Sequence, residues 1–72
     1  MEAPETFEIT VNGQPQRVVA GTSLVRLLDD RSLDRRFLVV EYNGKPLGAE
    51  QFDAVVLAAG DKLELVRPVA GG

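Results

Sequence analysis

Two Asn-Gly pairs, at positions 12–13 and 43–44, limit what this chain can fold into. Asn and Gly both tolerate the positive φ of a two-residue hairpin turn, so each pair predicts a tight β-turn between two strands. The first pair follows residues 6–11, where apolar and polar side chains alternate strictly. This alternation places Phe7, Ile9 and Val11 on one face, which is typical of a half-buried strand. The N-terminal part therefore predicts a β-hairpin.

Three further strands are predicted from β-forming residues and turn signals. The hairpin returns over about residues 16–20, with Pro15 at its start, where a missing N–H matters least; the pattern leaves open whether Val18 or Val19 faces inward. A strand over 37–42 ends at the second Asn-Gly pair, and a strand over 62–66 follows a turn at Gly60-Asp61. The side chains expected to face inward on these two strands are Leu38, Val40 and Tyr42, then Leu63 and Leu65.

One helix is predicted between the second and third strands. Gly21-Thr22-Ser23 interrupts the strand and offers a hydroxyl cap, and Leu24, Leu27 and Leu28 then form one apolar stripe at helical spacing. We expect the helix over residues 23–31. Residues 45–53 are expected to form a loop with one helical turn near 49–52, anchored by Phe52, and residues 54–57 are a candidate for a short additional strand.

A helix of two to three turns is marginal alone, so it must cover one face of the sheet that the strands form. Short connections favour a mixed sheet with the last strand beside the first. This order predicts an α+β fold, the ubiquitin-like β-grasp, with a mixed four- to five-stranded sheet and one main helix on one face. We expect the domain to span residues 1–67 and a flexible tail to span residues 68–72.

Composition excludes several classes of function. The 72 residues include neither Cys nor His, which rules out disulfides and catalytic triads built on either residue and argues against a metal site. The acidic residues Asp29, Asp30 and Asp34 are interpreted as solvated charge. A net charge of −3 argues against nucleic-acid binding.

No apolar run approaches the roughly 18 residues of a membrane span, and the first residues are too acidic for a signal peptide. We expect a cytoplasmic, monomeric module that binds no cofactor and is not itself an enzyme.

The C-terminal Gly71-Gly72 pair is the feature most suggestive of chemistry. With 7 Gly among 72 residues, two given positions would both be Gly roughly 1% of the time, so chance is the weaker explanation. Glycine has no Cβ, so Gly71 and the small Ala70 could thread a narrow tunnel in a partner. The carboxylate of Gly72 is a poor electrophile, but ATP can convert it into an acyl-adenylate that sulfur or nitrogen nucleophiles attack.

Two valines are expected on the outer face of the sheet, opposite the inward set. Val39 and Val66 occupy positions where a soluble monomer would carry polar residues. Together with Val69 they are candidates for a partner-docking surface. Scattered exposure with no function is the alternative.

The chain resembles the ThiS family of thiamin-pathway sulfur carriers, which are relatives of the molybdopterin carrier MoaD. The resemblance depends on the order and spacing of several short segments rather than on any one of them. They are 11–13, 20–24 with Leu27-Leu28, 40–44, Gln51-Phe52, Val56-Leu57, 60–66 and the terminal 69–72. The chain differs from relatives at Leu47-Gly48-Ala49, where they usually carry a Val-Pro-Arg-like segment, and at Phe52, where many have Trp.

The resemblance implies a carrier rather than an enzyme. A ThiF/MoeB-like adenylating enzyme would consume ATP to activate Gly72, the carboxylate would become a thiocarboxylate, and a ThiG-like thiazole synthase would accept the sulfur. Related carriers serve molybdopterin, cysteine or tRNA thiolation, so these pathways remain alternatives. A ubiquitin-like protein modifier and a plain β-grasp interaction domain are the other two hypotheses.

Overall fold

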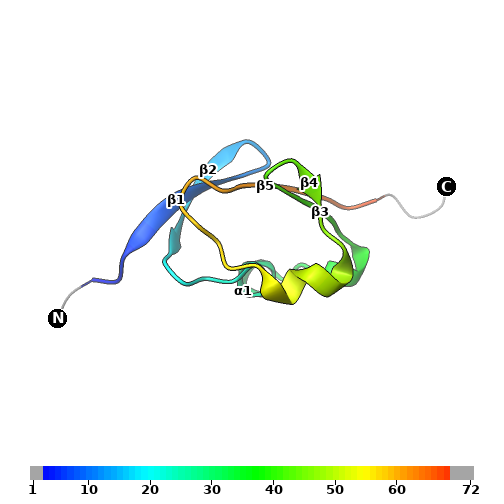
Figure 1. The fold of residues 1–72 in the computed structure, drawn as a ribbon, viewed down its shortest axis with the longest axis horizontal. Coiled ribbons are helices and arrows are strands. Elements are labelled where there is room, and N and C mark those ends of the chain that lie inside the picture. Colours follow the sequence, from blue (N-terminus) through cyan, green and yellow to red (C-terminus); the bar gives the residue numbers. More distant parts are fainter. Residues whose placement is uncertain (1–2, 69–72) are drawn as a thin grey trace.

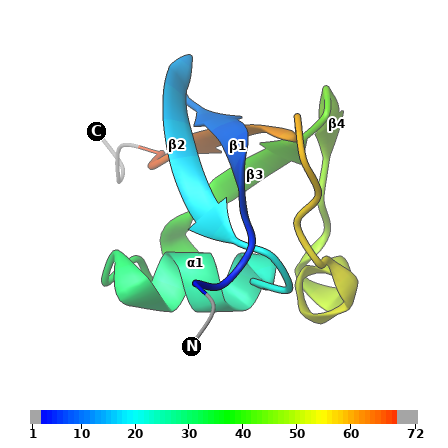
Figure 2. The same ribbon diagram turned by 90° about the vertical axis from the view of Figure 1, so that its left-hand side faces the viewer.

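A five-stranded mixed sheet and the helices on one side of it make up the protein, in a computed structural model that describes residues 3–68. Figure 1 shows α1 and the 3₁₀ helix η2 on the same side of the sheet, and Figure 2 shows α1 crossing beneath the strands. The elements are β1 (Thr6–Val11), β2 (Gln14–Val19), α1 (Leu24–Asp30), η1 (Arg35–Phe37), β3 (Val39–Tyr42), β4 (Lys45–Pro46), η2 (Ala49–Ala54) and β5 (Lys62–Val66). The predicted β-grasp architecture is confirmed.

The strand order is β2-β1-β5-β3-β4. β5 pairs parallel with β1 and antiparallel with β3, so the last strand lies beside the first, as predicted. Both Asn-Gly turns are confirmed as two-residue hairpin loops. Asn12 and Asn43 have φ of 51° and 52°, and the glycine after each is also at positive φ. These angles are those of the mirror-image turn that matches the twist of the strands.

β2 begins earlier than predicted, at Gln14 rather than residue 16, and ends at Val19. Pro15 lies inside the strand opposite Thr10, which is tolerated because β2 is at the edge of the sheet. The question of which valine faces inward is also answered. Val18 is buried in the core, whereas Val19 is about half exposed, at 47%.

The prediction that the third strand starts at residue 37 is wrong, because β3 starts at Val39. Phe37 belongs instead to η1, a single 3₁₀ turn. The Asp34 carboxylate accepts a hydrogen bond from the backbone N–H of Arg36 at 3.0 Å, and the Asp34 carbonyl accepts one from Phe37 at 3.0 Å. These two bonds close the turn before the chain can extend.

The segment between β3 and β5 departs from prediction in two places. Lys45–Pro46 forms a short strand, β4, rather than loop, because the hairpin turn returns it beside β3. Residues 54–57 form no strand: Ala54 ends η2, and Val56 makes one isolated bridge with Ser23. The helical turn predicted near 49–52 is present as η2, and Phe52 anchors it in the core with 3% of its surface exposed.

The predicted helix is confirmed as α1, with Ser23 as its N-cap. The Ser23 hydroxyl accepts a hydrogen bond from the backbone N–H of Arg26 at 3.0 Å. Leu24, Leu27 and Leu28 are all buried in one core with inward residues of the sheet. Each buried leucine contributes about 2 kcal/mol, enough to hold a seven-residue helix that would be marginal in isolation.

The C-terminus of α1 ends in a Schellman motif in which Ser32 takes the place usually filled by glycine. Ser32 has φ of 56° and donates its backbone N–H to the Asp29 carbonyl at 3.0 Å, while Leu33 donates to the Leu28 carbonyl at 2.9 Å. Leu33 also packs against the core. The motif satisfies helix carbonyls that would otherwise lack partners. A left-handed serine carries a steric cost that glycine does not.

We therefore expect Ser32→Gly to stabilise the protein. The relief of left-handed strain at one residue should raise the free energy of unfolding by about 1 kcal/mol. Urea titration followed by circular dichroism would measure it. Gly13→Ala changes another residue at positive φ and should lower the free energy of unfolding. A loss of stability in Ser32→Gly would contradict the assignment of strain to this residue.

Candidate functional site

The C-terminal residues continue from β5, which both Asn-Gly turns hold in place. Asn12 pairs with the backbone of Leu65: its Oδ1 accepts from the Leu65 N–H at 2.7 Å and its Nδ2 donates to the Leu65 carbonyl at 3.2 Å. On the other side, Asn43 exchanges two hydrogen bonds with the backbone of Lys62, each 2.8 Å long. The strand that leads to the chain's C-terminal residues is thus bound from both sides.

Asp61, just before β5, is a buried carboxylate at the centre of a hydrogen-bond network. Its Oδ2 accepts from the Tyr42 hydroxyl at 2.7 Å and from the Ala58 N–H at 2.8 Å, and its Oδ1 accepts from Asn43 Nδ2 at 3.1 Å. Only 7% of the residue is exposed. The sequence pattern predicts only a turn at Asp61. The network also ties the end of β3 to the start of β5.

The pKa of Tyr42 is raised above its usual range. The first cause is the phenol hydrogen bond to the Asp61 carboxylate, and the second is partial desolvation of the ring. The folded state therefore keeps the phenol proton at a pH where the unfolded chain has lost it. The stability from this pair should be fully present below about pH 10 and decline as pH rises through the folded-state pKa.

Tyr42 is the sole tyrosine and the chain has no tryptophan, so tyrosinate absorbance reports on this group alone. We expect its titration midpoint in the folded protein to lie above that of free tyrosine, and Asp61→Asn to lower it. We also expect urea midpoints to fall above about pH 10 in the wild type but less steeply in Tyr42→Phe. An unshifted absorbance midpoint with Asp61 intact would show that the hydrogen bond does not form.

The predicted docking valines face outward at the end of β5. Val39 lies directly opposite Val66, and both are about half exposed, at 46% and 54%. Their positions on the outer face are confirmed, while a docking role stays a prediction. The other predicted site residues, Val69, Ala70, Gly71 and Gly72, lie outside the described residues, and the boundary at residue 67 likewise stays a prediction.

Phe37 is an exposed aromatic residue near the same end of the sheet, and sequence reasoning missed it as a candidate. Two thirds of it is exposed, at 66%, and the Arg36 guanidinium lies 5.4 Å from the ring centroid. Its β-forming side chain predicts a strand position rather than an exposed turn. The available signal was Asp34, a residue type that caps turns, three positions earlier.

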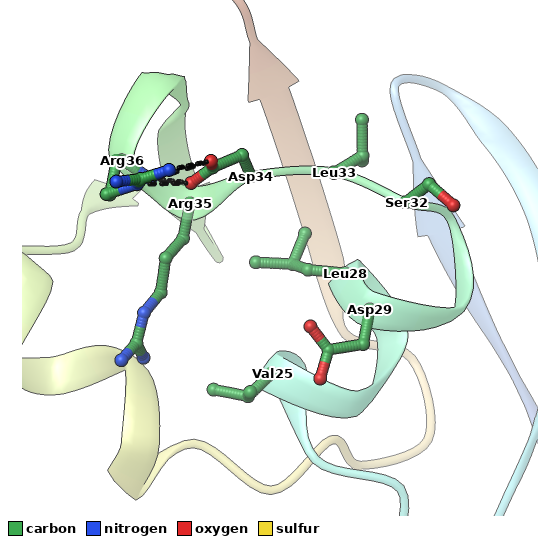
Figure 3. A pocket seen from close by; sticks show the side chains of 8 residues that line it. All are labelled: Val25, Leu28, Asp29, Ser32, Leu33, Asp34, Arg35 and Arg36. Atoms are coloured by element: carbon green, nitrogen blue, oxygen red, sulfur yellow. Dashed lines mark hydrogen bonds and ion pairs between the residues drawn. The ribbon is translucent and has the colours of Figure 1, made fainter.

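A hollow of about 540 Å³ opens between α1 and η1 (Figure 3). Its arginines are already paired: Arg36 binds Asp34 at 2.7 Å, and Arg35 reaches across to Asp53 at 2.9 Å. The hydrogen bonds from the Arg36 side chain lower the pKa of Asp34 to about 2. No reactive group converges here, and its lining shares no residue with β5. The remaining lining residues are Val25, Leu28, Asp29, Ser32 and Leu33.

No metal-binding cluster of acidic side chains occurs within residues 3–68, so Asp29, Asp30 and Asp34 form no divalent site there. Within the same range, no helix has the length and apolar character needed to cross a membrane. The described residues also leave no buried side-chain nitrogen or oxygen without a hydrogen-bond partner.

The sheet order and the covering helix define a ubiquitin-like β-grasp protein. The chain belongs to the ThiS family, whose model matches residues 9–72. It is similar to the crystal structure of the thiamine biosynthesis protein ThiS from Geobacter metallireducens, with a TM-score of 0.74 and 33% sequence identity. That match covers 92% of this chain and 100% of the other. No curated protein sequence matches the chain significantly.

Proposed function

We propose that this protein is a sulfur carrier of thiamine biosynthesis whose reactive group is the carboxylate of Gly72. Membership of the ThiS family and the likeness to a thiamine biosynthesis protein support this assignment. The structural observation that carries it is the position of β5. This strand is paired on both sides and ends only six residues before the terminal Gly72, so a rigid domain is joined directly to a slender terminus.

The proposed chemistry begins with adenylation. A ThiF/MoeB-like enzyme joins the Gly72 carboxylate to the AMP part of ATP and releases pyrophosphate. A sulfide-level sulfur donor then attacks the acyl carbon, and one former carboxylate oxygen leaves with AMP. The product is a thiocarboxylate, which a thiazole synthase of the ThiG type accepts as its sulfur source. In this proposal the carrier holds no cofactor of its own, because its partner consumes the ATP. We place the carrier in the cytoplasm as a monomer.

Mass spectrometry distinguishes this proposal from the alternatives. After incubation with the adenylating enzyme, ATP and a sulfur donor, we expect a mass gain equal to the replacement of one oxygen by sulfur. Isopeptide adducts with lysine would instead support a protein modifier. If an enzyme shown to be active on its own carrier leaves this chain unmodified, the carrier function is wrong. To identify the pathway, a thiazole synthase would be added to the thiocarboxylate form. Acceptors from the molybdopterin, cysteine or tRNA pathways would be tested in its place.

Deletion of Gly72 should abolish adenylation while leaving the fold intact. The new terminal carboxylate would lie one residue short of its position in the partner, and misplacement of a reacting group by even 1 Å can cost about 100-fold. We expect at least that loss in ATP–pyrophosphate exchange with an unchanged melting temperature. Full activity in the shortened chain would show that the Gly72 carboxylate is not the reacting group.

Gly71→Val tests whether the terminus must be thin. A branched side chain should hinder entry into a narrow tunnel and reduce exchange by at least about tenfold. Because we place residue 71 beyond the folded domain, the melting temperature should stay at the wild-type value. Val19→Ala, a change at an exposed residue of β2, is the matched control for activity. A large fall in melting temperature for Gly71→Val would show that this residue packs against the domain.

A further inference from the structure

The parallel pairing of β1 with β5 ends before β5 does. The register of the two strands stops at Val11 and Leu63. One more bond follows, from the Asn12 N–H to the Leu63 carbonyl at 2.9 Å. The next step of a parallel ladder lies two residues further along both strands and would reach Leu65 on β5. Because the chain turns at residues 12–13, β1 has no residue left to make this step.

The backbone of Leu65 faces the side of β5 on which β1 has ended. The Lys62 carbonyl accepts a hydrogen bond from the Asn43 N–H, on the side of β3, and the Leu63 carbonyl accepts from Asn12, on the side of β1. Carbonyls along a strand point alternately to its two edges, so the Leu65 carbonyl points the same way as that of Leu63. Pairing with β3 therefore cannot satisfy the backbone of Leu65.

The side chain of Asn12 takes the place of the missing strand residue. Its Oδ1 accepts from the Leu65 N–H at 2.7 Å, and its Nδ2 donates to the Leu65 carbonyl at 3.2 Å. A primary amide offers a carbonyl acceptor and an N–H donor, the same groups that a peptide unit offers. Asn12 thus holds β5 one residue before the strand ends at Val66.

Asn43 makes as many side-chain hydrogen bonds but acts at the other end of β5. Its Oδ1 accepts from the Lys62 N–H at 2.8 Å, and its Nδ2 donates to Asp61 at 3.1 Å. Lys62 is the first residue of β5, roughly 10 Å along the strand from Leu65. The two asparagines have φ of 51° and 52° in the same type of turn, and they bind opposite ends of one strand.

Loss of the Asn12 side-chain bonds would leave the end of β5 paired with β3 alone. A two-stranded ribbon twists more than a strand paired at both edges. Gly72 is seven residues beyond Leu65, and seven residues span at most about 25 Å. A change of roughly 10° in the direction of the strand end, within the spread of sheet twists, moves a point about 12 Å away by about 2 Å. Misplacement of a reacting group by even 1 Å can cost about 100-fold in rate.

We propose that Asn12 is a positioning residue for the reaction at Gly72. Its amide sets the direction in which the chain leaves β5, and thereby the place that the terminal carboxylate reaches in the adenylating enzyme. This inference rests on the proposed carrier function. Asn12 acts only through the backbone of Leu65 and takes no part in the chemistry, so its removal should lower the rate and leave the product unchanged.

Two matched glycine variants separate positioning from stability. Asn12→Gly and Asn43→Gly each delete two side-chain hydrogen bonds, and both keep a residue suited to positive φ in the turn. We expect both to lower the melting temperature. At saturating carrier, Asn12→Gly should lower kcat of ATP–pyrophosphate exchange at least about tenfold, whereas Asn43→Gly should stay within about twofold of the wild type. Assays well below the melting temperatures keep all three proteins folded.

The kinetic constants identify a merely structural role. Destabilisation lowers the folded fraction of the carrier, which raises the apparent KM and leaves kcat at saturation unchanged. Loss of positioning instead lowers kcat, while Kd from calorimetric titration into the enzyme without ATP stays within about twofold. Equal losses of kcat in the two glycine variants, or a raised KM alone, would overturn the proposal.

Amide hydrogen exchange in the full chain, followed by NMR without enzyme, tests the hydrogen bond itself. The Leu65 N–H should exchange several-fold faster in Asn12→Gly and at the wild-type rate in Asn43→Gly. An unchanged Leu65 rate in Asn12→Gly would overturn the proposal. If that variant fails to fold, Asn12→Asp keeps the turn and the acceptor but loses the donor to the Leu65 carbonyl, and it should also lower kcat.

Failure of this inference differs from failure of the proposed function. If the wild type is adenylated and Asn12→Gly reacts as fast, the positioning role is wrong and the carrier function stands. If an enzyme active on its own carrier never adenylates the wild type, the carrier function is wrong and the positioning role is wrong with it.

Discussion

The pairing of β5 between β1 and β3 is the constraint on which the rest of the structure depends. Each Asn-Gly turn does two things: its backbone reverses the chain, and its asparagine side chain binds the backbone of β5. Asp61 completes the arrangement by accepting hydrogen bonds from Tyr42, Asn43 and the turn before β5. β5, which pairs with the strand most distant from it in sequence, is thus held by three side-chain hydrogen bonds to its backbone.

This arrangement explains how so small a domain can serve as a carrier. A partner enzyme that acts on a terminal carboxylate needs a fixed surface close to it, because a long flexible link would lower the population of reactive geometry. β5 supplies a fixed origin, and the exposed valines Val39 and Val66 lie at its end. α1 packs against the opposite face, and among residues 3–68 Val39 and Val66 stay exposed on this side of the sheet. The division between a packed inner face and an available outer face comes directly from one helix covering one sheet.

Most of the regular elements could be predicted because their signals are local. Alternation from Thr6 to Val11, the turn chemistry of Asn12-Gly13 and the leucine stripe of α1 each act within a few residues. The errors have two causes. At Phe37 one local signal outweighs another, because the cap by Asp34 curls this strand-forming residue into η1. Residues 54–57 have a strand-like composition, yet only Val56 finds a partner, at the start of α1.

The sequence alone determined the fold class, the terminal Gly-Gly and the outward position of Val39 and Val66, since period-two alternation and turn chemistry are properties of neighbouring residues. Only the tertiary structure decided that Asp61 is a buried hub, that Glu41 and Glu64 stand opposite each other, and that Phe37 is exposed near the end of β5. These depend on the register between strands far apart in the chain. No hairpin turn joins β3 to β5, so turn geometry does not set their register, and burial of one face against α1 decides which residues stand opposite each other.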